Sequence, residues 1–103
     1  MITRVVKLTF IPEEIDAFKQ QFDAVKHTIV GMPGCMEVRL LQNSKYANIL
    51  FTISKWESEE MLNAYRKTAF FKDTWSKTSA KFCALPQAWT LNELECLNKD
   101  TCD

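Results

Sequence analysis

Two kinds of apolar periodicity alternate along this chain, and their order limits the possible folds more than any other feature. Residues 2–10 alternate with a period of two, which predicts a strand with one side made of Ile2, Arg4, Val6, Leu8 and Phe10. The next segment changes to three- and four-residue steps, through Ile15, Phe18, Phe22, Val25 and Ile29. That stripe predicts a helix of about 17 residues, which begins near Pro12 and ends at Gly31.

The same two periods return in the second half of the chain. Residues 35–42 and 47–55 predict two strands, and the loop-forming segment 43–46 between them is short enough for a hairpin. Ser58 is a typical N-cap residue, so we expect a second helix to begin there. Thr68 is expected to cap a slightly bent continuation of this helix.

The second helical stripe ends before Pro86, and residues 87–97 predict the last strand. The order strand, helix, strand, strand, helix, strand predicts an α+β fold of the ferredoxin-like βαββαβ kind. We expect a four-stranded antiparallel sheet with two helices on one face and crossovers that link parallel neighbours. Residues 1–97 would form this domain, and residues 98–103 a polar C-terminal tail.

The sheet face without helices raises the question of what covers it. This face is expected to carry half of Val6, Leu8, Val38, Leu40, Phe51 and Trp89, or their alternates. Seven Phe, three Trp and two Tyr are many large side chains for 103 residues, and an open apolar face of that size is unfavourable in water. We therefore predict a homodimer through the open sheet face, which needs an interface of about 1,200–2,000 Å².

Composition excludes several classes of partner. The 13 basic and 13 acidic residues balance, and no basic stripe is present that could follow a phosphate backbone, so no nucleic acid partner is expected. No apolar run is long enough to cross a membrane, and the charged N-terminal segment does not read as a leader, which predicts a cytoplasmic location. Cys35, Cys83, Cys96 and Cys102 are far apart and the one imidazole, His27, should face solvent, so we expect free thiols and no metal site.

The segment from Gly31 to Phe82 resembles the antibiotic biosynthesis monooxygenase (ABM) domain family. The resemblance lies in the turn with Gly31, Pro33, Gly34 and Cys35, the hairpin that ends in Trp56, the acidic helix start at residues 57–60, and the pair Phe70-Phe71. With the flanking strands it covers roughly residues 2–95. It implies a dimeric α/β barrel with a cavity between sheet and helices in each subunit. It also implies a cofactor-independent monooxygenase acting on a small aromatic or quinol substrate.

One branch of this family degrades haem, using an Asn on the first strand and a Trp and an iron-ligating His on the second helix. In this chain the matching positions are Val6, Tyr65 and Trp75. Indole nitrogen is only a hydrogen-bond donor, so Trp75 cannot ligate iron. Haem degradation is therefore not expected, and no cofactor is predicted.

Six residues are candidates for a substrate pocket: Val6, Asn48, Trp56, Tyr65, Phe71 and Trp75. The aromatic members could stack on a flat ligand, with the Tyr65 hydroxyl as the orienting polar group. At the same helical spacing they could instead be core or dimer-interface residues, and a turn residue is the simpler explanation of Asn48. The sequence pattern does not indicate which residue would act as a catalytic base. The alternative function is a non-catalytic, ligand-binding or stress-response barrel.

Overall fold

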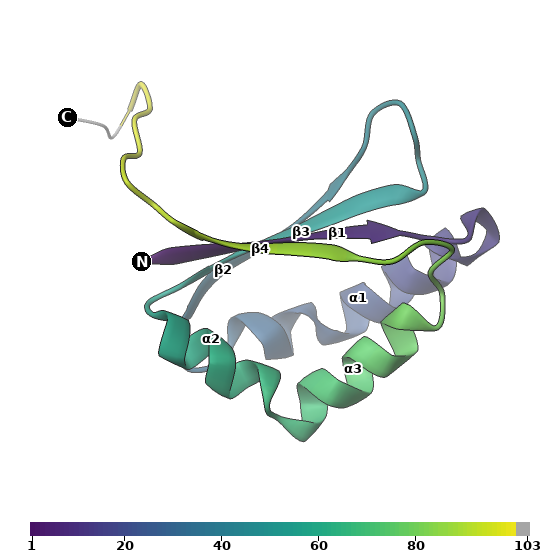
Figure 1. Cartoon of the computed structure of the whole chain (residues 1–103), viewed down its shortest axis with the longest axis horizontal. Helices are drawn as coiled ribbons and strands as arrows, with labels where there is room; N and C mark the ends of the chain where they lie inside the picture. Colours follow the sequence, from purple (N-terminus) through teal and green to yellow (C-terminus); the bar gives the residue numbers. More distant parts are fainter. Residues whose placement is uncertain (101–103) are drawn as a thin grey trace.

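The computed structural model describes residues 1–100, which form an antiparallel sheet of four strands with helices on one face only (Figure 1). The strands are β1 (Ile2–Thr9), β2 (Cys35–Gln42), β3 (Ile49–Trp56) and β4 (Gln87–Asn92). The helices are the 3-10 turn η1 (Pro12–Glu14), α1 (Ile15–Val30), α2 (Glu59–Arg66) and α3 (Ala69–Ser79). The predicted ferredoxin-like α+β fold is confirmed, with three α-helices instead of two. The end of the predicted tail, including Cys102, lies outside the described residues.

The strands lie in the order β2-β3-β1-β4, and each neighbouring pair is antiparallel. The expectation that the crossovers link parallel neighbours is wrong. The helix α1 connects β1 to β2 with β3 between them, and α2 and α3 connect β3 to β4 with β1 between them. Each crossover thus spans one inserted strand, so β1 and β3 form the centre of the sheet.

The predicted helix caps are both present. The Ser58 hydroxyl accepts a hydrogen bond from the Met61 amide at 3.2 Å at the start of α2. The Thr68 hydroxyl accepts from the Phe71 amide at 3.0 Å and donates to the Tyr65 carbonyl at 2.7 Å. Because Thr68 is in extended backbone and serves the end of α2 and the start of α3 together, the two helices are separate rather than one slightly bent helix.

Two strands are shorter than the sequence predicts. β3 begins at Ile49 rather than at residue 47, because Ala47 and Asn48 belong to the turn that follows Tyr46. β4 ends at Asn92 rather than at residue 97 because Asn92 is paired with Ile2, where β1 begins. Beyond that point β4 has no neighbouring strand to pair with.

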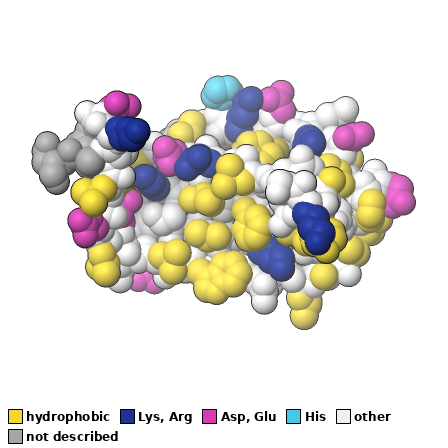
Figure 2. Space-filling view, turned by 90° about the horizontal axis from the view of Figure 1, so that it is seen from above, with side chains coloured by type: hydrophobic (Ala, Val, Ile, Leu, Met, Phe, Trp, Pro, Cys, Tyr) yellow, Lys and Arg dark blue, Asp and Glu magenta, His cyan; other side chains and the backbone are white. Residues whose placement is uncertain are grey.

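The two faces of the sheet differ sharply in burial. Leu8, Phe10 and Leu50 point toward the helices and pack with Phe18 of α1. The alternate residues point away and form the open face, on which an apolar diagonal crosses all four strands: Leu41, Phe51, Ile53, Val5, Trp89 and Leu91. Figure 2, which looks onto this side of the molecule, shows hydrophobic side chains gathered over the sheet with charged residues among and around them. Of the six residues named for this face, Phe51 and Trp89 lie on it, and the other four face the helices.

No helix within residues 1–100 is both long enough and apolar enough to cross a membrane. Cys35, Cys83 and Cys96 are free thiols. His27 is exposed on α1, as predicted.

The turn before β2 supplies a test of the fold. Gly34 has a positive φ of 82°, and a Cβ there would lie 2.7 Å from the Cβ of Met61 on α2. We expect Gly34→Ala to lower the free energy of unfolding by about 2 kcal/mol, because a left-handed backbone and a steric clash act together. Chemical denaturation measures this change.

Gly31→Ala is the matched control, since Gly31 has an ordinary φ of −81°. Its new Cβ would meet the His27 carbonyl oxygen at 3.2 Å, so a loss below about 1 kcal/mol is expected. Equal losses in the two variants would show that the conformation of Gly34 is not the cause.

Candidate functional site

The helix-facing side of the central β1–β3 pair changes character along its length. From one end to the other, the facing residues are Leu8 and Leu50, Val6 and Thr52, Arg4 and Ser54, and Ile2 and Trp56. The first and last pairs are buried, and each belongs to a separate apolar core cluster. The two middle pairs line a cavity of about 420 Å³ between the sheet and the helices. The small side chains of Thr52 and Ser54 leave space there that larger residues fill at both ends.

A continuous series of aromatic rings surrounds this cavity. Successive rings have centroids 4.5–6.1 Å apart, in the order Trp56, Tyr65, Phe71, Trp75, Phe82, Phe10, Phe18 and Phe22. All of them except Phe82 and Phe10 line the cavity directly. The volume is within the range of about 300–1,000 Å³ that is usual for small-molecule pockets. The aromatic wall favours a flat, largely apolar ligand.

Five of the six residues that the sequence nominates lie together in this lining: Val6, Trp56, Tyr65, Phe71 and Trp75. Asn48 does not line the cavity and lies in the turn before β3, in line with its alternative interpretation as a turn residue. Its side-chain amide donates to the Phe10 carbonyl at 3.0 Å. Asn48 therefore fastens the end of β1 to the turn before β3.

Tyr65 is the polar group at the centre of the aromatic wall. Its ring stacks on Trp56 with centroids 5.0 Å apart and meets Phe71 edge-on at 5.1 Å. Burial, followed by the nearby Cys35, raises the pKa of Tyr65 to about 12. Near neutral pH the phenol is therefore protonated and can donate a hydrogen bond, but it is not a general base.

Trp56 and Cys35, which neighbour Tyr65, provide no reactive group. The indole nitrogen of Trp56 donates to the Ser54 hydroxyl at 2.9 Å, which fixes the ring that Tyr65 stacks on. Burial raises the pKa of the Cys35 thiol, so it stays protonated and weakly nucleophilic near neutral pH. These contacts position the wall but provide no catalytic base.

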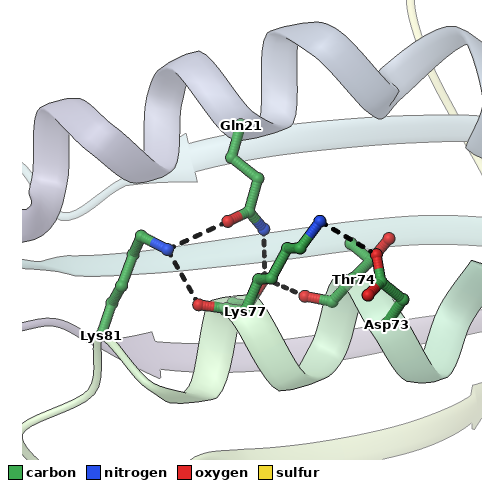
Figure 3. A network of polar contacts seen from close by, with 6 residues as sticks. Gln21, Asp73, Thr74, Lys77 and Lys81 are labelled. Atoms are coloured by element: carbon green, nitrogen blue, oxygen red, sulfur yellow. Dashed lines mark hydrogen bonds and ion pairs between the residues drawn. The ribbon is translucent and has the colours of Figure 1, made fainter.

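A polar network joins α1 to α3 on the helix side of the cavity (Figure 3). The Gln21 amide nitrogen donates to the Thr78 hydroxyl at 2.7 Å, and the Thr78 hydroxyl donates to the Thr74 carbonyl at 2.8 Å. Lys81 donates to the Gln21 amide oxygen at 3.1 Å and to the Lys77 carbonyl at 2.9 Å. Because Thr78 is buried, this network holds the two helices at a fixed separation beside the cavity.

Two arginines of the lining were not nominated from the sequence. Arg4 of β1 and Arg66, the last residue of α2, both line the cavity. A signal for Arg4 was present, because the alternation of the first strand places it on the same side as Ile2 and Val6. A charge on the buried side of a strand indicates a gap in the packing. Arg66 carried no comparable signal, since a basic residue is ordinary at a helix C-terminus.

The donor set of the cavity does not fit haem. No His, Cys or Met side chain belongs to the lining, and the raised pKa of Tyr65 disfavours a tyrosinate ligand. Val6, Tyr65 and Trp75 do lie in the cavity, but none provides the imidazole of the haem-degrading branch. Within residues 1–100 no group of three or more His, Cys, Asp or Glu side chains could hold a metal ion.

Comparison with known proteins gives one family. A family model described as antibiotic biosynthesis monooxygenase matches residues 1–76. A crystal structure of an antibiotic biosynthesis monooxygenase superposes with a TM-score of 0.85 at 16% identity, covering 92% of this chain and 100% of that one. A conserved protein from Methanosarcina mazei Go1 has a TM-score of 0.84 at 19% identity, with coverages of 90% and 93%. At these identities the structural likeness shows the fold, and no curated protein has a significantly similar sequence.

The raised pKa of Tyr65 can be measured directly. In an alkaline absorbance titration, one phenolate component should appear near pH 12 and be absent from Tyr65→Phe. The unfolded chain ionises this group near its ordinary value of 10 while the folded chain does not. The contribution of Tyr65 to the free energy of unfolding should therefore be present below pH 10 and fall between pH 10 and about 12.

Tyr46→Phe is the control, because Tyr46 is exposed in the loop between β2 and β3. It should leave the component near pH 12 in place. If Tyr65→Phe removed a component that titrates at an ordinary phenol pKa, the burial of this hydroxyl would be refuted.

Proposed function

Because the chain belongs to the antibiotic biosynthesis monooxygenase family, we propose that it is a cofactor-independent monooxygenase of a small aromatic or quinol substrate. One observation carries the proposal: an apolar cavity of about 420 Å³ whose wall is a series of aromatic rings. Such a cavity can hold a planar ring system, exclude water from it and keep it in one orientation.

The reaction proposed needs no electrons from a cofactor. A ring carbon of the substrate is oxidised to a carbonyl, one atom of dioxygen forms that carbonyl, and the other leaves as water. The substrate itself supplies all four electrons. The chain has to stabilise the substrate anion that reacts with dioxygen and to keep water away from it.

Tyr65 has a defined part in this proposal. As a neutral phenol that lines the cavity, it can donate a hydrogen bond to an oxygen of the substrate. The flanking rings of Trp56 and Phe71 would stack on the substrate or on each other and limit how it rotates. Tyr65 would then orient the substrate rather than deprotonate it.

A second candidate function rests on what the lining contains. It includes no imidazole and no carboxylate, so no group there titrates near neutral pH to serve as a general base. That composition supports a non-catalytic barrel which binds a small ligand. The two candidates share the cavity and the ligand class and differ only in whether a product forms.

We also propose that the protein works as a homodimer through the open sheet face. Its apolar diagonal includes Phe51, Ile53 and Val5, together with Trp89 and Leu91, which are 43% and 48% exposed. The charged flanks of the diagonal carry both signs, since Lys55 lies 3.9 Å from Glu37 and 3.7 Å from Glu93. A second copy of the same face would cover the diagonal and complement its flanks.

Residues 1–97 are proposed as the functional unit, because the cavity lining ends at Ala88 within the described residues. The free thiols of Cys35 and Cys83 support a reducing, cytoplasmic location.

The enzymatic proposal is tested with a panel of reduced naphthoquinols and isotopically labelled dioxygen. We expect mass spectrometry to find one labelled oxygen atom in the product and no turnover in anaerobic samples. Tyr65→Phe should lower kcat/KM by about 10-fold, the worth of one hydrogen bond to the substrate. Tyr46→Phe, which removes a hydroxyl outside the cavity, should leave kcat/KM unchanged.

Equal rates with and without dioxygen would refute the monooxygenase. Thermal stabilisation by the same quinols with no product by mass spectrometry would favour the non-catalytic barrel instead.

The dimer is tested by placing a charge at the centre of the apolar diagonal. Ile53→Lys should convert the protein from dimer to monomer in sedimentation equilibrium, because association would bury an unpaired ammonium group. Leu85→Lys is the matched control, because Leu85 is 90% exposed in the segment between α3 and β4 and belongs to no strand of the sheet. A wild-type protein that is monomeric at all concentrations, or an Ile53→Lys variant that remains dimeric, would contradict the proposal.

A further inference from the structure

The charged side chains of the cavity are of one sign. Among all the residues that line it, only Arg4 and Arg66 carry a charge near neutral pH, and both are cations. They come from different elements, the central strand β1 and the end of α2. A pocket that is otherwise aromatic and weakly polar therefore has two guanidinium groups and no acid to balance them.

Arg4 is held in place without being neutralised. Its Nη1 donates to the Thr90 hydroxyl on the neighbouring strand β4 at 2.7 Å. Burial, followed by the charge of Arg66, lowers the pKa of Arg4. The effect of burial shows that the guanidinium of Arg4 is partly removed from water. The effect of Arg66 shows that the two cations lie within electrostatic range of each other. Arg4 nevertheless remains charged at any physiological pH.

Within residues 1–100, neither arginine is paired with an acid. The ion pairs among residues 1–100 involve Lys26, Lys55 and Lys77, and none of them includes Arg4 or Arg66. Two like charges that face one partly buried space repel each other, and that cost is offset when an anion binds between them. Guanidinium groups suit this role, because they bind carboxylate and phenolate oxygens with paired donors.

We propose that the ligand of this cavity is an aromatic anion, a planar ring system with a carboxylate or ionised hydroxyl that binds between Arg4 and Arg66. The inference rests on the proposed function and narrows its substrate class. The ring system lies against the aromatic wall of Tyr65, Phe71 and Trp75, and its charged oxygen points to the arginine side.

Arg4 and Arg66 would also allow an oxidation to start in a cavity without a general base. Two adjacent positive charges lower the pKa of a bound phenol or quinol, since they favour its ionised form. An acidic substrate can therefore be bound already ionised, and the neutral phenol of Tyr65 can donate to the same oxygen or a second one. Deprotonation then requires no residue of the protein.

Binding of matched ligand pairs tests this assignment. The probes are lawsone, a naphthoquinone with an acidic hydroxyl that is ionised at neutral pH, and its methyl ether, and also naphthoate and its primary amide. Calorimetry should show each anion binding about 10- to 100-fold more tightly than its neutral partner, as charge-assisted hydrogen bonds predict. Comparing the two pairs shows whether an ionised hydroxyl or a carboxylate is preferred.

Substitutions then locate the effect. Arg66→Gln, on the exposed end of α2, should lose most of the preference for the anion and leave the neutral ligand unaffected. Arg4→Gln should do the same, and Arg4→Lys, which keeps the charge, should retain part of the preference even if the contact with Thr90 is altered. Lys72→Gln is the control, because it removes one exposed cation of α3 that does not line the cavity.

Equal affinity for anion and neutral partner in the wild-type protein would overturn the inference, as would an anion preference that survives Arg4→Gln and Arg66→Gln together.

Turnover of substrate is a separate outcome. Anion-selective binding without any oxidised product would keep the inference and refute the monooxygenase. Oxidation of neutral substrates that is indifferent to both arginines would do the reverse.

Discussion

The pairing of β1 with β3 determines where the space between sheet and helices is filled by packed side chains and where the cavity lies. Both strands are central in the sheet, and their facing residues are large and apolar at the two ends but small or polar in the middle. Helices packed over such a pair touch the sheet at Leu8 and Leu50 and again at Ile2 and Trp56. They are kept apart from it between these points. The cavity is therefore a consequence of side-chain size along one strand pair, not of an unusual backbone.

The same register links the cavity to the open face. Val6 and Thr52 face the cavity, while Val5 and Ile53, each one residue away, face the other side as part of the apolar diagonal. A one-residue slip of β1 would turn Val5 toward the cavity and Arg4 toward the open face. The buried core cluster at Leu8 prevents this slip, because the slip would also expose Leu8. The proposed ligand site and the proposed dimer face thus depend on one set of strand contacts.

Sequence patterns predicted the element order, both caps and most of the aromatic wall, because each depends on residues close together in the chain. Trp56, Tyr65, Phe71 and Trp75 follow one another at turn and helix spacing, so their convergence needs only a correct local structure. The strand register depends on distant contacts. The same holds for the role of Asn48, whose side-chain amide donates to the Phe10 carbonyl, 38 residues away. Thr52 and Ser54 were missed because their small size has meaning only opposite Val6 and Arg4.

Arg4 is the residue that packing alone explains least. Its neighbours on the same side of β1, Ile2 and Val6, are apolar. At both ends of the β1–β3 pair, aliphatic and aromatic side chains fill the space between the sheet and the helices. A Leu or Met at this position would avoid both the desolvation of a guanidinium and the repulsion from Arg66. Sequences depart from such local rules mainly at functional sites, where a ligand offsets the cost. An anion bound between Arg4 and Arg66 is the partner that would make this arrangement favourable, whereas a neutral ligand would leave both charges without one.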